Sequence, residues 1–214
     1  MDKNTLFQSL EQAVRDHSRS LIERTLNEVR PGEVELDGVL EALCRGLDSA
    51  REGFKHHLVS MPEFLLSVDV FREALRALNA MGMRRPAAAA PARVVIGVVE
   101  GDVHDLGKNI VAGVLEAYGY NVVDLGRDVP ARLFVEEARK QDASLLALSC
   151  MMSTPLEHMK EVIRWSRREV PGVPIIVGGA VLDAELAVAI GADGYAESAG
   201  TVPEEARRLL APRT

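Results

Sequence analysis

The second half of the chain alternates short apolar runs with longer segments of helical character. The apolar runs are "RVVIGVV" (93–99), "NVVDLG" (121–126), "SLLALSC" (144–150), "PIIVGG" (174–179) and "ADGYAE" (192–197). The helical segments lie at 105–118, 130–140, 155–169, 182–190 and 200–210. Apolar strands that are each followed by a helix are typical of a parallel sheet covered on both faces. We therefore predict an α/β domain over 93–214 with a five-stranded parallel sheet.

A sheet of this kind, flavodoxin-like (Rossmann-like) in class, binds its ligands beyond the carboxyl ends of the strands, where the strand order reverses. Three features of the sequence fall along that edge. They are the polar loop 101–107, Ser149 and the pair Gly178-Gly179. This edge is the predicted site.

The first half of the chain has a helical period instead. Apolar stripes recur through residues 5–80, interrupted at Pro31-Gly32, and a fourth helix is expected to start near Pro62. That helix is expected to bury the apolar side chains Leu65, Leu66, Val70, Leu75 and Leu78. We predict a four-helix bundle that caps the α/β domain, over 1–85, and a linker at 86–92 within "MRRPAAAAPAR".

Composition excludes several classes of protein. The net charge of −7 argues against a sequence-independent nucleic-acid surface. Apolar runs are too short to span a membrane, and the first residues lack the apolar core of a secretory signal. Cys44 and Cys150 form neither a disulfide framework nor a metal-type pair. We expect a cytoplasmic protein with no nucleic-acid or membrane partner.

The loop "GDVHDLGKNIV" (101–111) allows several interpretations. In the simplest, His104 is solvated and Asp102 caps the helix that follows. The glycine spacing does not match a dinucleotide site, and Asn109 stands where a phosphate-binding loop needs a hydroxyl. A divalent-metal site built from Asp102, His104 and Asp105 would lack further ligands.

The remaining interpretation is that His104 binds a transition metal carried in a large organic ligand. A metal-bound imidazole usually gives its other N–H to a carboxylate, and Asp102 is two residues away. Gly107 removes a side chain where a bulky group must pass close to the backbone.

Here the sequence resembles a known family. "DVHDLG" is similar to the D-x-H-x-x-G motif of cobalamin-binding domains, "ALSCMMS" stands at their S-x-L and "VGGA" at their Gly-Gly, in the same order across 93–199. "GFKHHLVSMPEFLLS" resembles part of the family's helical cap. The chain thus resembles corrinoid proteins of the methyltransferase type. These include the cobalamin module of methionine synthase and the corrinoid subunits of methanol, methylamine and O-demethylase methyltransferase systems.

The resemblance implies cobalamin bound base-off, with His104 as the lower axial ligand of cobalt and Asp102 as its partner, through a cycle of methylcobalamin and Co(I). Gly107, Ser149, Gly178 and Gly179 would then accommodate the nucleotide tail. The other residues implied to line the cofactor are Gly101, Val103, Asp105, Leu106, Met151 and Ser153, with Met61 and Leu65 from the cap.

Some positions depart from the family pattern. Pro155 stands where methionine synthase-like members carry a relay hydroxyl, which Ser153 or Thr154 would have to replace. Ser60 stands where an aromatic usually covers the upper face of the corrin. His56-His57 is interpreted as a solvated helix end, or as a ligand for the upper axial position.

Three functions compete. The first is a methyl carrier between a substrate-specific methyltransferase and a second methyltransferase that uses tetrahydrofolate or a thiol, kept active by a reductive activation protein. Such a component has no turnover of its own. The second is a cobalamin-dependent sensor or regulator, which needs an output element that the helical half does not show. The third is the small subunit of an adenosylcobalamin mutase, a class that generally lacks a helical cap.

Overall fold

The computed structural model describes residues 2–83 and 92–211. The chain divides into two compact units, Met1–Pro86 and Ala87–Thr214, and each is described by itself. The predicted linker, 86–92, falls mostly outside the described residues.

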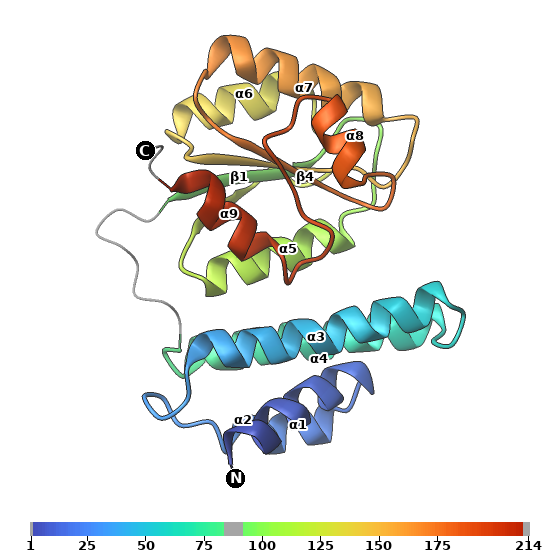
Figure 1. Cartoon of the computed structure of the whole chain (residues 1–214), viewed down its shortest axis with the longest axis vertical. Helices are drawn as coiled ribbons and strands as arrows, with labels where there is room; N and C mark the ends of the chain where they lie inside the picture. Colours follow the sequence, from blue (N-terminus) through green and yellow to red (C-terminus); the bar gives the residue numbers. More distant parts are fainter. Residues whose placement is uncertain (1, 84–91, 212–214) are drawn as a thin grey trace. The chain divides into compact units, whose positions relative to one another are not determined.

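The N-terminal unit is helical (Figure 1). Its helices are α1 (Lys3–Arg15), α2 (Arg19–Leu26), α3 (Leu36–Lys55) and α4 (Met61–Ala80). Side-chain oxygens of Asp2 and Ser18 accept the hydrogen bonds that begin α1 and α2. Large side chains buried at less than 2% exposure join the helices into one core, among them Leu10, Ile22, Leu40, Leu43, Phe71 and Leu78.

The α4 helix corrects one prediction and explains one departure. Leu65 and Leu66 were expected in the core, but they are 43% and 44% exposed. The buried stripe of α4 runs through Ser67, Phe71 and Leu78, and Leu65 lies roughly 200° around the helix from Ser67. Ser60 is the N-cap of α4 in a capping box with Glu63, whose carboxylate accepts from the Ser60 N–H at 2.8 Å. Serine at position 60 therefore serves to cap α4.

The second unit has five parallel strands and five helices among the described residues. The strands are β1 (Arg93–Val98), β2 (Asn121–Asp124), β3 (Leu145–Ser149), β4 (Ile175–Gly178) and β5 (Gly194–Tyr195), in the order β2-β1-β3-β4-β5. The helices are α5 (Leu106–Ala117), α6 (Ala131–Lys140), α7 (Leu156–Glu169), α8 (Ala184–Ala189) and α9 (Val202–Leu210). The predicted architecture, a helical region followed by a five-stranded parallel sheet, is confirmed.

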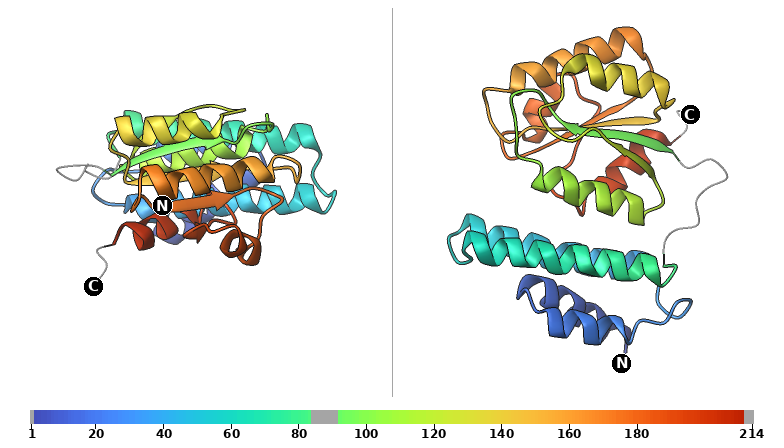
Figure 2. Two further views of the ribbon diagram at one scale, coloured as in Figure 1. Left: turned by 90° about the horizontal axis from the view of Figure 1, so that it is seen from above. Right: turned by 180° about the vertical axis from the view of Figure 1, so that it is seen from behind.

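Helices cover both faces of the sheet, as Figure 2 shows from behind. Val95 and Leu146 pack on one face against Phe134 of α6 and the buried side of α7. Val94 and Leu145 pack on the other face, against α5 and α9. Alternate residues of one strand thus enter different cores, which explains why the strands are apolar throughout.

The sheet order reverses between β1 and β3. The chain leaves β1 for α5 on one face, and it leaves β3 for α7 on the opposite face. The two connections diverge at the carboxyl edge, where Val98 and Ser149 are paired. This is the point at which open α/β sheets bind ligands.

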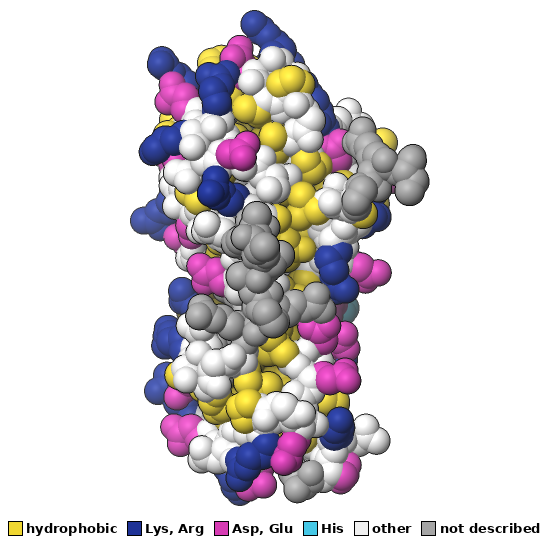
Figure 3. All heavy atoms as spheres, turned by 90° about the vertical axis from the view of Figure 1, so that its left-hand side faces the viewer, with side chains coloured by type: hydrophobic (Ala, Val, Ile, Leu, Met, Phe, Trp, Pro, Cys, Tyr) yellow, Lys and Arg dark blue, Asp and Glu magenta, His cyan; other side chains and the backbone are white. Residues whose placement is uncertain are grey.

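The distribution of charge and the apolar character of the helices can be compared with the sequence analysis. On the face drawn in Figure 3, Lys and Arg are interspersed with Asp and Glu over both units. Among the helices that the structure describes, none combines the length and the apolar character needed to cross a membrane.

Candidate functional site

The polar loop after β1 is held by its own backbone. Val99 continues the line of β1, and its N–H donates to Ser149 O at 3.1 Å. Asp102 N–H then folds back to Val99 O at 3.1 Å, with Gly101 at φ 82°. A positive φ favours glycine at that position.

The carboxylate of Asp102 is fully buried and lies between two segments of chain. Its Oδ1 accepts from the backbone N–H of His104 at 2.9 Å and lies 2.7 Å from His104 Nδ1. Its Oδ2 accepts from the backbone N–H of Met151 at 2.6 Å. Asp105, not Asp102, is the N-cap residue of α5, and its side chain makes no capping bond. The interpretation of Asp102 as a helix cap is therefore wrong.

These contacts fix the protonation pattern of the pair. Burial alone raises the pKa of Asp102, but the hydrogen bonds from His104 and Met151 outweigh it and bring the pKa below its usual value. The carboxylate is therefore charged at neutral pH and accepts the proton carried by Nδ1 of His104. The His104 side chain is 52% exposed. With Nδ1 bonded to Asp102, Nε2 is the ring nitrogen left to bind a metal.

A cage of carboxylates around this histidine is not formed. Within residues 2–83 and 92–211, no group of three His, Cys, Asp or Glu side chains is placed to hold a metal ion. The divalent-metal interpretation of Asp102, His104 and Asp105 is therefore excluded. A metal that brings most of its own ligands needs only one protein ligand, and His104 fits that need.

Apolar side chains are exposed on the two segments of chain that the Asp102 carboxylate joins. Val103 is 57% exposed, and Met151 and Met152, just beyond β3, are 42% and 45% exposed. We call these three residues the apolar rim. Exposed apolar side chains gathered at one place indicate a surface that a ligand covers. A flat macrocycle whose metal sits over Nε2 would contact this rim.

The residues behind the rim are packed. Ser149 is half-buried at the end of β3, and Cys150 is buried with its Sγ donating to Met152 O at 3.0 Å. Burial raises the pKa of the Cys150 thiol, so it is a poor nucleophile. Pro155, also buried, is the N-cap residue of α7, while Ser153 and Thr154 are exposed.

The predicted glycines differ in why they are needed. Gly179 has φ 133°, and a Cβ there would lie 1.9 Å from Cys150 O, so the packing of β4 on β3 requires glycine. A Cβ on Gly178 would lie 3.1 Å from Ala196 O. A Cβ on Gly107 would meet nothing within 4 Å, so the protein itself gives no reason for glycine there. This open space suits a ligand that passes close to α5.

The structure brings most predicted site residues together. Residues 101–107, with Asp105 and Leu106 half-buried, lie at the carboxyl edge with Ser149, Met151, Ser153 and the glycine pair. Met61 and Leu65 belong to the helical unit, where Met61 is 49% exposed. Whether any of these residues contacts a cofactor stays a prediction.

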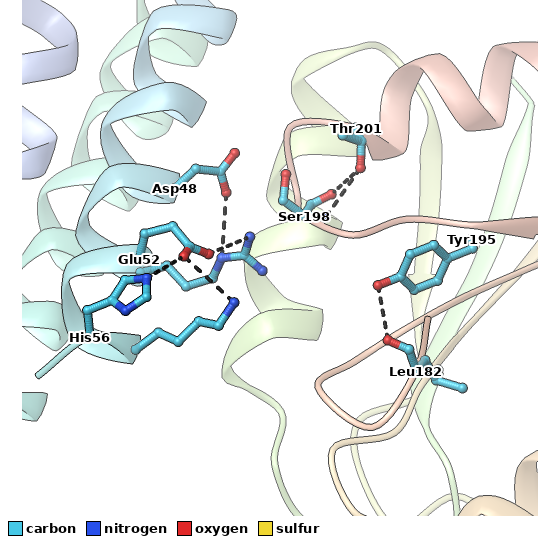
Figure 4. A network of polar contacts seen from close by, with 9 residues as sticks. Asp48, Glu52, His56, Leu182, Tyr195, Ser198 and Thr201 are labelled. Carbon is cyan, nitrogen blue, oxygen red and sulfur yellow. Dashed lines mark hydrogen bonds and ion pairs between the residues drawn. The ribbon is translucent and has the colours of Figure 1, made fainter. Parts of the chain in front are cut away.

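Figure 4 shows polar contacts outside this site, in each of the two units. At the end of α3, Nε2 of the C-cap residue His56 lies 3.6 Å from the carboxylate of Glu52, one turn earlier. In the other unit, Tyr195 Oη donates to Leu182 O at 3.1 Å and Thr201 Oγ1 donates to Ser198 O at 2.9 Å. The second group stabilises the loops after β4 and β5, which follow the glycine pair.

Sequence reasoning missed three residues beside the loop. Lys108, in the first turn of α5, is 3% exposed, and its Nζ binds Asn109 Oδ1 at 2.5 Å and the carboxylate of Asp124 at the end of β2. Asp128, in the connection after β2, accepts from Gly101 N–H at 2.7 Å. Charged residues at a helix start and after a strand were the available signals, but they did not indicate which partners would meet.

Comparisons with known proteins identify cobalamin-binding and corrinoid proteins as similar to this chain. The family described as "B12 binding domain" matches residues 92–203. Dimethylamine corrinoid protein 1 of Methanosarcina acetivorans is 33% identical over 99% of this chain and 100% of the relative, and the dimethylamine corrinoid protein of Methanosarcina barkeri gives the same values.

Two solved structures are also similar over most of the chain. The monomethylamine corrinoid protein of Methanosarcina barkeri is 25% identical with a TM-score of 0.74, over 98% of this chain and 99% of that one. A chain of the methanol:cobalamin methyltransferase complex of Methanosarcina barkeri is 27% identical with a TM-score of 0.61, over 100% of this chain and 82% of that one.

Proposed function

Because the chain belongs to the family of proteins with a B12-binding domain, with cobalamin as its cofactor, we propose that it is a methyl carrier. In this proposal, a substrate-specific methyltransferase delivers a methyl group to the bound corrinoid. A second methyltransferase passes the group to tetrahydrofolate or a thiol, and a reductive activation protein restores the active cofactor. The relatives that match over the full length, helical unit included, support a carrier over a mutase subunit or a sensor.

The arrangement of Asp102 and His104 carries the proposal. The carboxylate of Asp102 occupies Nδ1, so Nε2 is the ring nitrogen that would hold the cobalt of a base-off cobalamin. Cobalamin, when bound, supplies a metal centre that accepts and releases a methyl group. Gly107 and the glycine pair at the end of β4 would accommodate the displaced tail.

The residues of the loop have separate tasks in this mechanism. Asp102 holds the proton on Nδ1 and orients the ring. The apolar rim would contact the bound cofactor and keep water away from it.

The test is electron paramagnetic resonance of the Co(II) form after reconstitution with cobalamin. The wild-type spectrum should show splitting from one histidine nitrogen, and His104→Ala should lose it. His158→Ala is the matched control, because His158 is a 43% exposed histidine of the same unit whose nearest carboxylate is Glu100 at 3.9 Å. In protein labelled with 15N, the histidine nitrogen splits each line into two, whereas the unlabelled base of cobalamin splits it into three. Two-line splitting that survives His104→Ala would refute the ligand assignment.

Methyl transfer needs a separate assay. The reduced holoprotein should react with methyl iodide to give a stable alkylated cofactor, seen by absorption spectroscopy. Dimethylamine with its methyltransferase is the first biological donor to test, since two full-length relatives carry that name. Light-dependent change of oligomeric state, without methyl uptake, would favour the sensor instead.

A further inference from the structure

Asp128 contacts the histidine loop with both its side chain and its backbone. Its Oδ1 accepts from the Gly101 N–H at 2.7 Å, and its own N–H donates to Asp102 O at 3.0 Å. Asp128 itself has φ 55°, a left-handed conformation that aspartate and asparagine adopt more readily than most residues. The two bonds attach on either side of the Asp102 Cα.

These bonds complete the fixation of Asp102. The Asp102 N–H already donates to Val99 O at 3.1 Å, and the carboxylate accepts from Met151 at 2.6 Å. With Asp128 in place, the backbone before and after Asp102 and its side chain are all held. The direction of the carboxylate, and thus of the His104 ring bonded to it, depends on this frame.

We propose that Asp128 is a positioning residue for the His104 ligand. Asp128 acts through Gly101 and Asp102, with no direct contact to His104 required. As far as it concerns cobalt, the inference rests on the proposed function. As far as it concerns the orientation and tautomer of the ring, it stands on the protein alone.

Two substitutions separate the hydrogen bond from the backbone conformation. Asp128→Asn keeps an oxygen acceptor for the Gly101 N–H and tolerates the positive φ. Asp128→Gly also tolerates the positive φ but removes the acceptor. Asp142→Gly is the matched control, because Asp142 is an exposed aspartate with φ 50° between α6 and β3, at the opposite edge of the sheet.

The first measurement uses the protein without cofactor. Nitrogen NMR of the full chain, at a pH where the ring is neutral, reports which nitrogen of His104 carries the proton. Wild type, Asp128→Asn and Asp142→Gly should show the Nδ1–H form. In Asp128→Gly the ratio of Nδ1–H to Nε2–H should fall about 3- to 10-fold, as expected for loss of one well-placed hydrogen bond.

The second measurement uses the cobalamin-reconstituted Co(II) form. The ratio of histidine-ligated to unligated spectrum should fall by a similar factor in Asp128→Gly and recover in Asp128→Asn. A thermal melt checks that the variants fold, and Asp128→Ser, whose shorter side chain draws the acceptor back, replaces Asp128→Gly if that variant does not.

Unchanged His104 tautomer and spectrum in Asp128→Gly would overturn the inference, and so would an equal loss in Asp142→Gly. If the wild-type protein has the Nδ1–H tautomer but its Co(II) form shows no nitrogen splitting from histidine, the assignment of His104 as cobalt ligand is refuted instead. In that case the role of Asp128 in orienting the ring would stand on the NMR result.

Discussion

Replacing the buried carboxylate of Asp102 by an amide should destabilise the α/β unit. In the native loop two oxygens serve three donors, at 2.9 and 2.7 Å from His104 and at 2.6 Å from Met151. Asparagine has one oxygen. If that oxygen faces His104, the amide NH2 faces the Met151 N–H, and two donors meet at a buried position. If the amide is flipped, both His104 donors lose their acceptor.

The expected cost follows from these contacts. One buried donor without a partner and the loss of charge from the remaining hydrogen bonds together give about 2–4 kcal/mol. Asp105→Asn is the control, since Asp105 lies in the same loop, is half-buried and makes no capping bond. It should cost less than about 0.5 kcal/mol.

Urea unfolding followed by tryptophan fluorescence measures this difference directly. The chain has one tryptophan, Trp165, and it lies on α7 of the α/β unit. The signal therefore reports that unit and not the helical one. A loss below about 1 kcal/mol in Asp102→Asn, or an equal loss in Asp105→Asn, would refute the view that the carboxylate is the anchor of the loop.

Three further predictions concern the same edge. The pKa of Asp102 in the folded protein lies below 3.8, so the stability that its carboxylate contributes is present above pH 3.8 and is lost as the pH falls further. The difference in unfolding free energy between wild type and Asp102→Asn should therefore narrow on acidification below pH 3.8. Asp124→Ala leaves the buried ammonium of Lys108 without its carboxylate and should lower the free energy of unfolding in urea by about 3 kcal/mol. Lys108→Met leaves a carboxylate that is 38% exposed and should lower it by about 1 kcal/mol. Equal losses would contradict the role of burial. Gly179→Ala should lower the free energy of unfolding by about 3 kcal/mol or more, because the new Cβ meets Cys150 O at 1.9 Å, and a melting temperature like that of wild type would show that the two backbones are not in contact.

The parts of the fold that follow from local pattern could be predicted from the sequence. Each strand is continuously apolar because alternate residues enter different cores, and that signal needs no knowledge of the partner strand. The pairing of Asp102 with His104 is also local, two residues apart. Leu65 was misplaced because an apolar residue reads the same whether it enters the core of its own unit or lies on the surface.

The contacts that hold the loop could not be predicted in this way. The Met151 N–H lies 49 residues from the carboxylate that it binds, and a backbone donor has no sequence signature. Asp128 looks like any turn aspartate until the sheet order places the connection after β2 beside the loop after β1. Such contacts are products of topology, and the residues that make them are found only from the structure.

The loop that carries His104 is therefore held by hydrogen bonds on its buried side, while the His104 ring is half exposed. The loop is tied to the β2 connection through Asp128 and Gly101, and to the end of β3 through Met151. The ring of His104 has one tied nitrogen and half of its surface free. Under the proposed function, this combination would let the ring bind and leave a metal while the loop stays in place. If the ring were held on both sides, Nε2 would not be accessible to a ligand, and if the carboxylate moved with the ring, Nε2 would not return to the same place.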